Sequence, residues 1–213
     1  MTKLVIIGAG EHGAVVADAA LLMAKWSEIV FLDDKDFGGA TVLGIPVVGR
    51  VDHWADLVDE DVEFFVAIGG NARRLEVLLA IESQQEAITS IVHPSAVVSP
   101  FAIVDPGVVV CAGAVINPRA TIGRGSIVNT GATIDHDCVI GDGVHISPGA
   151  NLAGGISVGD RSWIGIGASV RDGVTIGRDV VVGAGAAVVS DIADGKTVGG
   201  VPARTLSIRN SDD

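Results

Sequence analysis

The chain has few cysteines, few cations and no long apolar segment. Its 213 residues include only two cysteines, Cys111 and Cys138, too few for a disulfide scaffold and without the CxxC spacing of a zinc knuckle. The 14 Lys and Arg residues are outnumbered by 26 Asp and Glu, which gives a net charge of −12. Because a protein that binds a phosphate backbone needs the opposite sign, we do not expect a nucleic-acid partner.

No uncharged apolar segment reaches the ~18–20 residues that span a bilayer. The chain also does not open with the basic region and apolar run of a secretory signal. Nevertheless 48% of its residues are hydrophobic, so these side chains are expected to form a buried core. We therefore predict no membrane span, and the two cysteines favour a reducing, cytoplasmic location.

Glycine divides the chain into two parts. Nine of the 29 glycines lie in residues 1–92, and the other 20 lie beyond them. The boundary is placed at His93, because the following proline disfavours a helix at that position. The prediction is an N-terminal domain over 1–92, a second domain over 93–206, and a flexible tail over 207–213.

Strands alternate with helices in residues 1–92, which predicts a small parallel sheet of half-Rossmann type. About 92 residues are too few for the full double-mononucleotide fold, so this domain is expected to hold one nucleotide or a nucleotide-linked sugar. The predicted elements are strands at 3–7, 29–32, 62–68 and 88–92, a minor strand at 47–48, and helices at 14–25 and 72–83.

The motif Gly-x-Gly-x-x-Gly occupies residues 8–13, between the first predicted strand and the first helix. Its glycines allow a tight turn and let a phosphate approach the helix N-terminus, where free N–H groups favour negative charge. Asp33 follows the next strand, 20 residues after Gly13, where a carboxylate suits the hydroxyls of a sugar. The alternative is a glycine turn that serves chain packing alone.

A six-residue repeat runs from Val98 to Val188. Every sixth residue is a branched aliphatic, a small or apolar residue stands two positions before each, and ten of the 16 repeats carry glycine three positions after it. A period of six matches neither an α-helix nor an alternating strand. It predicts a parallel β-helix in which three repeats, about 18 residues, form one triangular coil.

Five motifs occur in order along the chain: the glycine motif at 8–13, Phe31-Leu32-Asp33-Asp34, Ala67-Ile68-Gly69, Ile134-Asp135-His136-Asp137-Cys138-Val139-Ile140-Gly141, and Gly199-Gly200-Val201-Pro202-Ala203. Together they resemble the sugar O-acyltransferase family of the sialic acid O-acetyltransferase type, within the hexapeptide-repeat acyltransferases. This family includes the bacillosamine-pathway and perosamine N-acetyltransferases. The resemblance covers nearly the whole chain and implies a left-handed β-helix, a homotrimer, and acetyl-CoA bound between neighbouring coils.

His136 is the candidate general base. It follows the repeat residue Ile134 by two positions, so its ring should leave the core near a corner, and an imidazole titrates close to neutral pH. From the residues alone, an exposed turn histidine is equally consistent. The resemblance implies the catalytic role, with Asp137 as the modulator of the imidazole.

His145 precedes the repeat residue Ile146, so it is also expected to point away from the core. Nine residues separate it from His136, which puts the two histidines on different faces, able to meet one ligand only across a subunit boundary. By resemblance, the acetyl-CoA contacts are His145, Ile166 and Ala184, the last replacing a frequent glycine. By resemblance, the nucleotide-sugar contacts are Gly10, Glu11, His12, Asp33, Asp34 and Gly69.

Several other side chains favour structural interpretations. Cys138 lies in the inward file of small residues, so we expect packing rather than an acyl-carrying thiol. No metal is expected, because the histidine spacings of 43 and 9 residues are not close to multiples of one coil. Asn71 and Arg74 begin the next predicted helix; one interpretation places them near the nucleotide-sugar contacts, and the other makes them a helix cap and a solvated charge. Trp163 is interpreted as a packing or interface residue.

The sequence therefore predicts an acetyl-CoA-dependent acetyltransferase. The expected acceptor is the 4-amino group of a UDP-linked amino sugar, with direct transfer assisted by His136. One alternative is O-acetylation of sialic acid or another glycan hydroxyl. Another, of a different class, is a trimer that binds a nucleotide sugar without catalysis.

Overall fold

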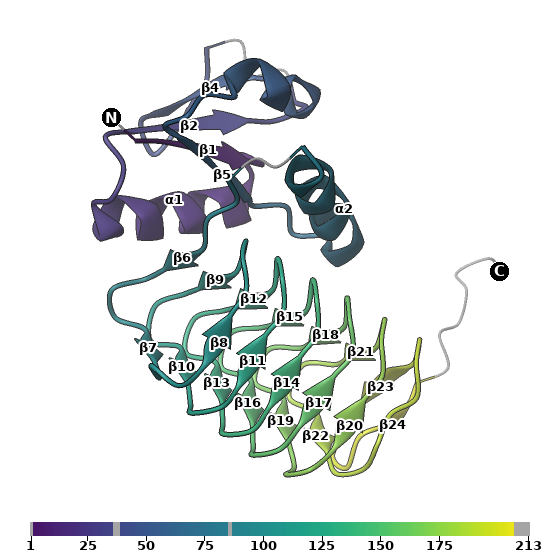
Figure 1. The fold of residues 1–213 in the computed structure, drawn as a ribbon. Coiled ribbons are helices and arrows are strands. Elements are labelled where there is room, and N and C mark those ends of the chain that lie inside the picture. The colour runs from purple at the N-terminus through teal and green to yellow at the C-terminus, as the bar shows by residue number, and fades with distance from the viewer. Residues whose placement is uncertain (1, 36–38, 85–86, 207–213) are drawn as a thin grey trace, which may run out of the picture.

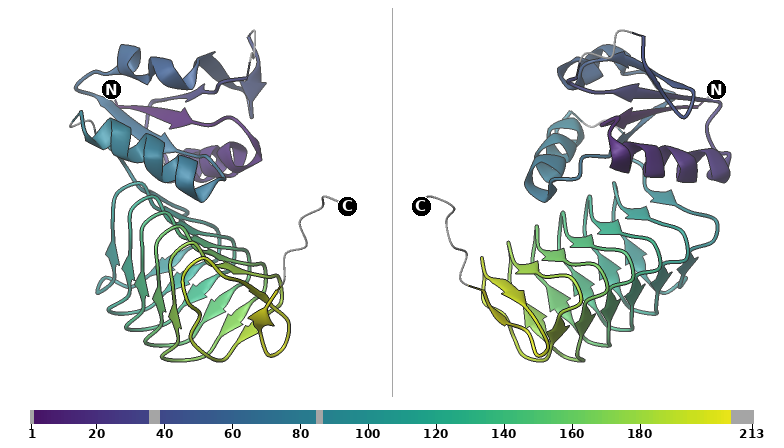
Figure 2. Two further views of the ribbon diagram at one scale, coloured as in Figure 1. Left: turned by 90° about the vertical axis from the view of Figure 1, so that its right-hand side faces the viewer. Right: turned by 180° about the vertical axis from the view of Figure 1, so that it is seen from behind.

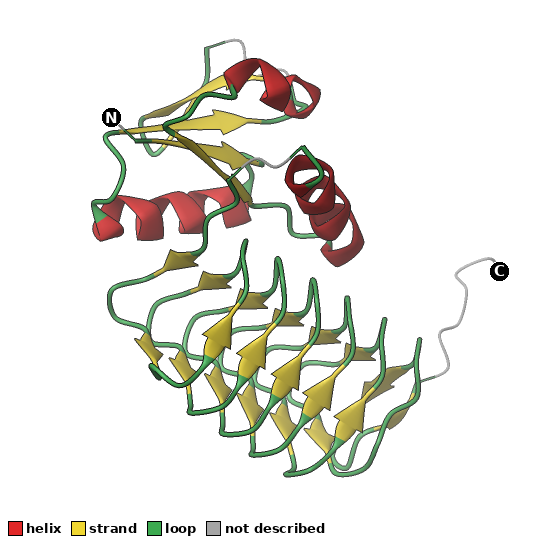
Figure 3. Cartoon of the chain, in the orientation of Figure 1, coloured by secondary structure: helices red, strands yellow, loops and turns green. Residues whose placement is uncertain are grey.

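The computed structural model describes residues 2–35, 39–84 and 87–206. An α/β domain lies against the first coils of a three-sided β-helix, and the later coils project beyond it (Figures 1 and 2). The helical segments of the described residues all belong to the α/β domain (Figure 3). Within the described ranges, no helix has the length and apolarity needed to cross a bilayer.

The α/β domain is built on a five-stranded sheet in the order β3-β4-β2-β1-β5. Four strands run parallel, and β3 pairs antiparallel with β4. Helix α1 packs on one face of the sheet, while α2 and the 3-10 helix η1 pack on the other, which explains why the central strand is apolar and buried. The elements are β1 (Lys3–Ile7), α1 (Glu11–Met23), β2 (Glu28–Leu32), β3 (Thr41–Val42), β4 (Ile45–Gly49), η1 (Val51–Leu57), β5 (Val62–Val66) and α2 (Asn71–Glu82).

Two expectations for this domain need correction. Helix α1 begins at Glu11, three residues before the predicted start, because Gly10 is its N-cap and the helix starts inside the glycine motif. The predicted strand at 88–92 is confirmed only for its last two residues. Ile88 makes only an isolated bridge to β5, and β6 (Ile91–Val92) pairs with the first coil of the β-helix instead. A short apolar run does not specify its partner, and β3 and η1 were not predicted at all.

The β-helix has three faces, each a sheet of short strands stacked at intervals of one coil. Face 1 contains β6, β9 (Val109–Val110), β12 (Ile127–Val128), β15 (His145–Ile146), β18 (Trp163–Ile164), β21 (Val181–Val182), β23 (Thr197–Gly199) and β24 (Arg204–Thr205). Face 2 contains β7 (Val97–Val98), β10 (Val115–Ile116), β13 (Thr133–Ile134), β16 (Asn151–Leu152), β19 (Ser169–Val170) and β22 (Ala187–Val188). Face 3 contains β8 (Ile103–Val104), β11 (Thr121–Ile122), β14 (Val139–Ile140), β17 (Ser157–Val158) and β20 (Thr175–Ile176).

The repeat predicted the interior of the β-helix. Its aliphatic residues from Val110 onward are buried in one continuous core, and only the first two, in the opening coil, are partly exposed. The ten repeat glycines have φ between 61° and 75°, a region that favours glycine. Four repeat positions reach the same region without glycine, at Arg119, Asp137, Arg161 and Asp179.

Candidate active site

His136 lies at the corner between β13 and β14, where faces 2 and 3 meet. Its ring is outside the β-helix, and its side chain is 56% exposed. The Nδ1 atom lies 2.7 Å from Oδ2 of Asp137. A neutral imidazole that donates its Nδ1–H to this carboxylate keeps the lone pair of Nε2 free, as a general base requires.

The turn that carries His136 is held from two sides. The Oδ1 atom of Asp135 accepts the backbone N–H of His136 at 2.7 Å and the side-chain amide of Asn117, one coil earlier, at 2.9 Å. One coil later, Gly154 leaves space for the ring: a Cβ there would lie 2.6 Å from Cε1 of His136. The sequence analysis did not single out Gly154, because its glycine lies outside the repeat position.

Cys138 is buried in the core next to this turn. Its Sγ atom lies 3.1 Å from the carbonyl oxygen of Ala153, and burial raises the pKa of the thiol. Both observations favour a packing role, because a nucleophilic cysteine needs an accessible thiolate.

The three predicted acetyl-CoA contacts lie together. His145, Ile166 and Ala184 line one groove of 520 Å³ along face 1 and the adjoining corner with face 2. Ile166 is 62% exposed there, and Gly165 and Gly183 form part of the wall. An elongated, largely apolar ligand such as the pantetheine arm of CoA fits this lining.

His145 points out of the β-helix as expected, yet it is only 9% exposed. Its ring stacks on Trp163 at a centroid distance of 4.7 Å, and its Nε2 lies 3.1 Å from Nδ2 of Asn129. Burial, followed by the charge of Arg74, lowers the pKa of His145 to about 3. It is therefore neutral at pH 7. Trp163 lines the groove, and Asn129 contacts His145 from the preceding coil; the sequence analysis assigned neither role.

The predicted nucleotide-sugar contacts gather at the carboxyl ends of β1, β2 and β5, which are neighbours in the sheet. Ligands of open α/β sheets bind at this edge. A Cβ on Gly8 or Gly13 would strike backbone atoms, whereas a Cβ on Gly10 or Gly69 would meet nothing within 4 Å. Packing thus explains two glycines of the motif and leaves open space at Gly10.

The two aspartates at the end of β2 have different partners. Oδ2 of Asp33 accepts the backbone N–H of Ala9 at 2.8 Å, which ties the glycine loop to β2. Asp34 is exposed, and its Oδ1 accepts the backbone N–H of Val51 at 3.2 Å. Asp34 is therefore the more accessible carboxylate for a ligand.

Arg74 joins the two domains. The expectation of a solvated charge is wrong, because the side chain is 1% exposed. Its guanidinium donates to the carbonyl oxygens of Gly125 and Gly143 in the β-helix and to those of Ile68 and Gly69 beside the glycine loop. Burial and the charge of Arg74 lower the pKa of His12 to about 4, so His12 is neutral at pH 7.

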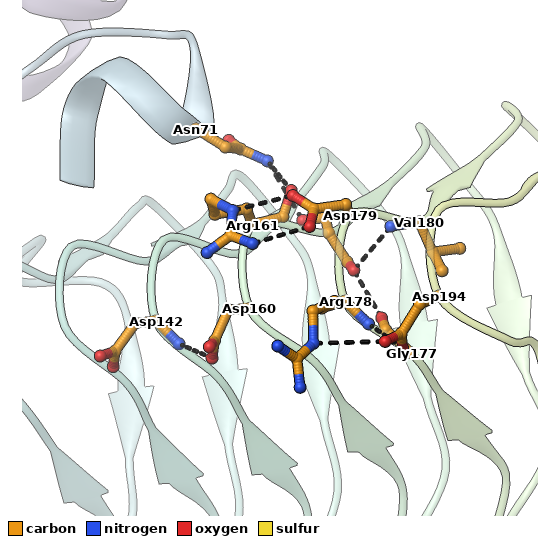
Figure 4. A network of polar contacts seen from close by, with 10 residues as sticks. Asn71, Asp142, Asp160, Arg161, Gly177, Arg178, Asp179, Val180 and Asp194 are labelled. Carbon is orange, nitrogen blue, oxygen red and sulfur yellow. Dashed lines mark hydrogen bonds and ion pairs between the residues drawn. The ribbon is translucent and has the colours of Figure 1, made fainter. Parts of the chain in front are cut away.

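Asn71 makes a second link between the domains. Rather than capping α2, its Nδ2 donates to the carbonyl oxygens of Arg161 and Ser162 at 2.9 and 3.2 Å (Figure 4). The amide and Arg74 also bond to each other at 2.9 Å. The N-terminus of α2 is therefore fixed on the corner between faces 3 and 1.

Within one chain, the base and the groove are apart. His136 is at the corner of faces 2 and 3, whereas Ile166 and Ala184 follow face 1 at the corner with face 2. The predicted separation of His136 and His145 onto different parts of the β-helix is thus confirmed.

Comparisons with known proteins identify both domains. The PglD N-terminal domain family matches residues 3–81, and the bacterial transferase hexapeptide (six repeats) family matches 119–154 and 155–189. The chain is 37% identical over 114 residues to UDP-N-acetylbacillosamine N-acetyltransferase from Bacillus subtilis (strain 168). This match covers 53% of the chain and about half, 52%, of that relative.

Two solved structures match along almost their whole length. The acetyltransferase domain of PglB from Neisseria gonorrhoeae FA1090, in complex with acetyl coenzyme A, is 44% identical, with a TM-score of 0.93 over 96% of this chain and 98% of that chain. A histidine-to-asparagine variant of perosamine N-acetyltransferase from Caulobacter crescentus, in complex with CoA and GDP-perosamine, is 40% identical, with a TM-score of 0.90 over 97% of this chain and 98% of that chain. The fold is accordingly an α/β domain followed by a left-handed parallel β-helix, and the chain belongs to the hexapeptide-repeat sugar acyltransferases that carry a PglD N-terminal domain.

Proposed function

We propose that this protein transfers the acetyl group of acetyl-CoA to the 4-amino group of a UDP-linked amino sugar. The observation that carries the proposal is the pair of His136 and Asp137, which leaves Nε2 of an exposed imidazole free at a corner of the β-helix. The relatives named above are sugar N-acetyltransferases, which favours an amine over a hydroxyl as the acceptor.

The reaction is direct transfer. The amine nitrogen attacks the thioester carbonyl carbon and forms the new C–N bond, while Nε2 of His136 takes the proton that the nitrogen loses. The C–S bond breaks, and the departing sulfur recovers that proton from the imidazole. Asp137 holds the Nδ1–H and stabilises the transient imidazolium. The burial of Cys138 supports this single-step route over an acyl-enzyme.

Each substrate has its own binding region. The apolar groove formed by His145, Ile166 and Ala184 suits the pantetheine arm of acetyl-CoA. The loop around Gly10, Glu11, His12 and Gly69 suits the phosphates of the nucleotide sugar, since it combines open space with the N-terminus of α1. We assign Asp33 and Asp34 to the nucleoside, with Asp34 as the freer group.

We further propose that the protein works as a homotrimer. Base and groove occupy different corners of one chain, so a complete site requires His136 of one subunit to face the groove of its neighbour. The buried, unpaired cysteines are those expected in a reducing compartment, and we place the enzyme in the cytoplasm.

Release of CoA thiol from acetyl-CoA tests the function. Purified protein is assayed with UDP-, GDP- and CMP-linked sugars, both amino and hydroxy. We expect turnover with a UDP-linked 4-amino sugar. Turnover only with sialic acid or a hydroxyl acceptor would instead indicate O-acetylation, and tight binding of a nucleotide sugar with no thiol release would indicate a binding protein.

His136→Ala is the first variant to compare. We expect kcat to fall by about 10²–10⁴-fold, the usual contribution of a general base, while acetyl-CoA binding persists. His53→Ala is the matched control, because His53 is also exposed but lies in η1, and it should retain full activity. Normal turnover by His136→Ala would refute the mechanism.

A further inference from the structure

We propose that Arg119 is a positioning residue of the reaction: it fixes the carboxylate of Asp137, which in turn fixes the imidazole of His136. The inference rests on the proposed function. Arg119 lies one coil before Asp137, at the same corner of faces 2 and 3. Neither the repeat nor the family motifs singled it out.

The contact is a two-point fork. Nε of Arg119 lies 2.6 Å from Oδ1 of Asp137, and Nη2 lies 2.7 Å from Oδ2. The same Oδ2 receives Nδ1 of His136 at 2.7 Å. A planar guanidinium bound at two points fixes the plane of a carboxylate, which a single donor does not do. The orientation of the imidazole is therefore set from the preceding coil.

Arg119 and Asp137 both stand at corner positions where most repeats have glycine. Arg119 and Asp137 occupy repeat positions with φ of 63° and 59°, where ten other repeats have glycine. Positive φ is unfavourable for a residue with a Cβ, more for arginine than for aspartate. Both residues nevertheless adopt this conformation, and it allows the Arg119 guanidinium to bind the Asp137 carboxylate beside His136.

A second pair shows what such a fork does without a histidine. Arg161 and Asp179 have the same 18-residue separation, contacts of 2.8 and 2.7 Å, and positive φ (Figure 4). The residue before Asp179 is Arg178, whereas His136 precedes Asp137. Arg161 and Asp179 lie at the corner of faces 3 and 1. Because the two forks share their geometry, Arg161 is an internal control for the structural effect of the pair.

Arg119 stabilises the negative charge of the Asp137 carboxylate. The hydrogen bond from Arg119, followed by that from His136, holds the pKa of the Asp137 carboxyl well below its usual range. Asp135 is the other acid on the turn, and the backbone N–H of His136 and the Asn117 amide lower its pKa. Because the side chain of Asp137 is 44% exposed, its carboxylate is free to rotate towards solvent once Arg119 is removed, and Nδ1 of His136 then loses its fixed partner.

The test replaces each arginine with the glycine that the repeat uses elsewhere. Arg119→Gly and Arg161→Gly both relieve the positive φ and both remove a surface ion pair. Arg161→Gly keeps the backbone carbonyl that accepts from Asn71, so we expect melting temperatures close to each other. We expect kcat to fall about tenfold in Arg119→Gly, less than a full general-base contribution, with KM for acetyl-CoA within about twofold. Arg161→Gly should keep the wild-type kcat. Arg119→Lys keeps the charge but not the two-point contact, so its kcat should lie between those of Arg119→Gly and the wild-type protein.

A double-mutant cycle with Asp137→Asn separates positioning from a structural effect, because asparagine tolerates the same backbone. If Arg119 acts through Asp137, Arg119→Gly combined with Asp137→Asn is no slower than Asp137→Asn alone. Equal kcat in the two glycine variants, or additive losses in the cycle, would overturn the inference. Absence of turnover in the wild-type protein would instead refute the proposed function.

Discussion

The two nitrogens of His136 have different surroundings, and this difference makes the ring suitable as a base. Nδ1 faces the Asp137 carboxylate, which leaves Nε2 as the nitrogen with the available lone pair. The ring edge formed by Nδ1, Cε1 and Nε2 lies over Gly154, where a Cβ would come within 3.1 Å of all three atoms. The absence of a Cβ at Gly154 therefore matters as much as the carboxylate at Asp137, since both determine where the free lone pair points.

Gly154→Ala tests this dependence. The added Cβ would lie 2.6 Å from Cε1 and 2.7 Å from Nε2 of His136, so the ring must rotate away from its position. We expect kcat to fall by about tenfold or more, because small displacements of a catalytic group cost about that much or more. The melting temperature should change little, since the exposed ring is free to move. A variant with wild-type kcat would show that the ring position is not required.

The elements of the β-helix follow from the sequence more completely than the site does. A period of six requires each residue to have a partner 18 positions away, so the aliphatic and glycine positions define the strands and the corners together. The junction of the two domains has no such period. Arg74 bonds to carbonyl oxygens 51 and 69 residues away, and a lone arginine near a helix start gives no signal of this. The neighbour of His145 is a different case. Trp163 lies 18 positions after it and pairs with it in the sheet, so the period does place the two rings side by side, although the sequence analysis interpreted Trp163 only as a packing or interface residue.

The junction should be sensitive to acid. Burial lowers the pKa of His12 to about 4 and that of His145 to about 3, from an ordinary 6.5. Between pH 6.5 and these lowered pKa values, the unfolded chain binds more protons than the folded one. The free energy of unfolding is therefore full above about pH 6.5 and falls as pH drops towards 4, by up to roughly 1.4 kcal/mol per pH unit for each imidazole.

Urea denaturation at pH 7.5, 5.5 and 4.5 measures this loss. His12→Gln and His145→Gln should each reduce the dependence on pH, whatever they do to stability at pH 7.5. His53→Gln, in the exposed η1 segment, should leave the slope unchanged. A slope that is the same in all three variants would contradict the assignment of these two buried histidines.

The whole molecule separates its chemistry between distant parts of one chain. The proposed base is at the corner of faces 2 and 3, the groove proposed for acetyl-CoA lies along face 1, and the loop proposed for the nucleotide belongs to the other domain. Arg74 and Asn71 tie the loop to the β-helix through hydrogen bonds to its backbone carbonyls, so the loop and the groove are held in one chain. In the proposed trimer, only the base then comes from a neighbouring subunit.

Complementation in mixed trimers tests the shared site most directly. One variant, His136→Ala, lacks the base, and the other, Ala184→Trp, fills the groove; each should be inactive alone. When the two are refolded together in equal amounts, about a quarter of the subunit boundaries combine an intact base with an intact groove. The account predicts about a quarter of wild-type activity, and mixed trimers that remain as inactive as the separate variants would contradict it.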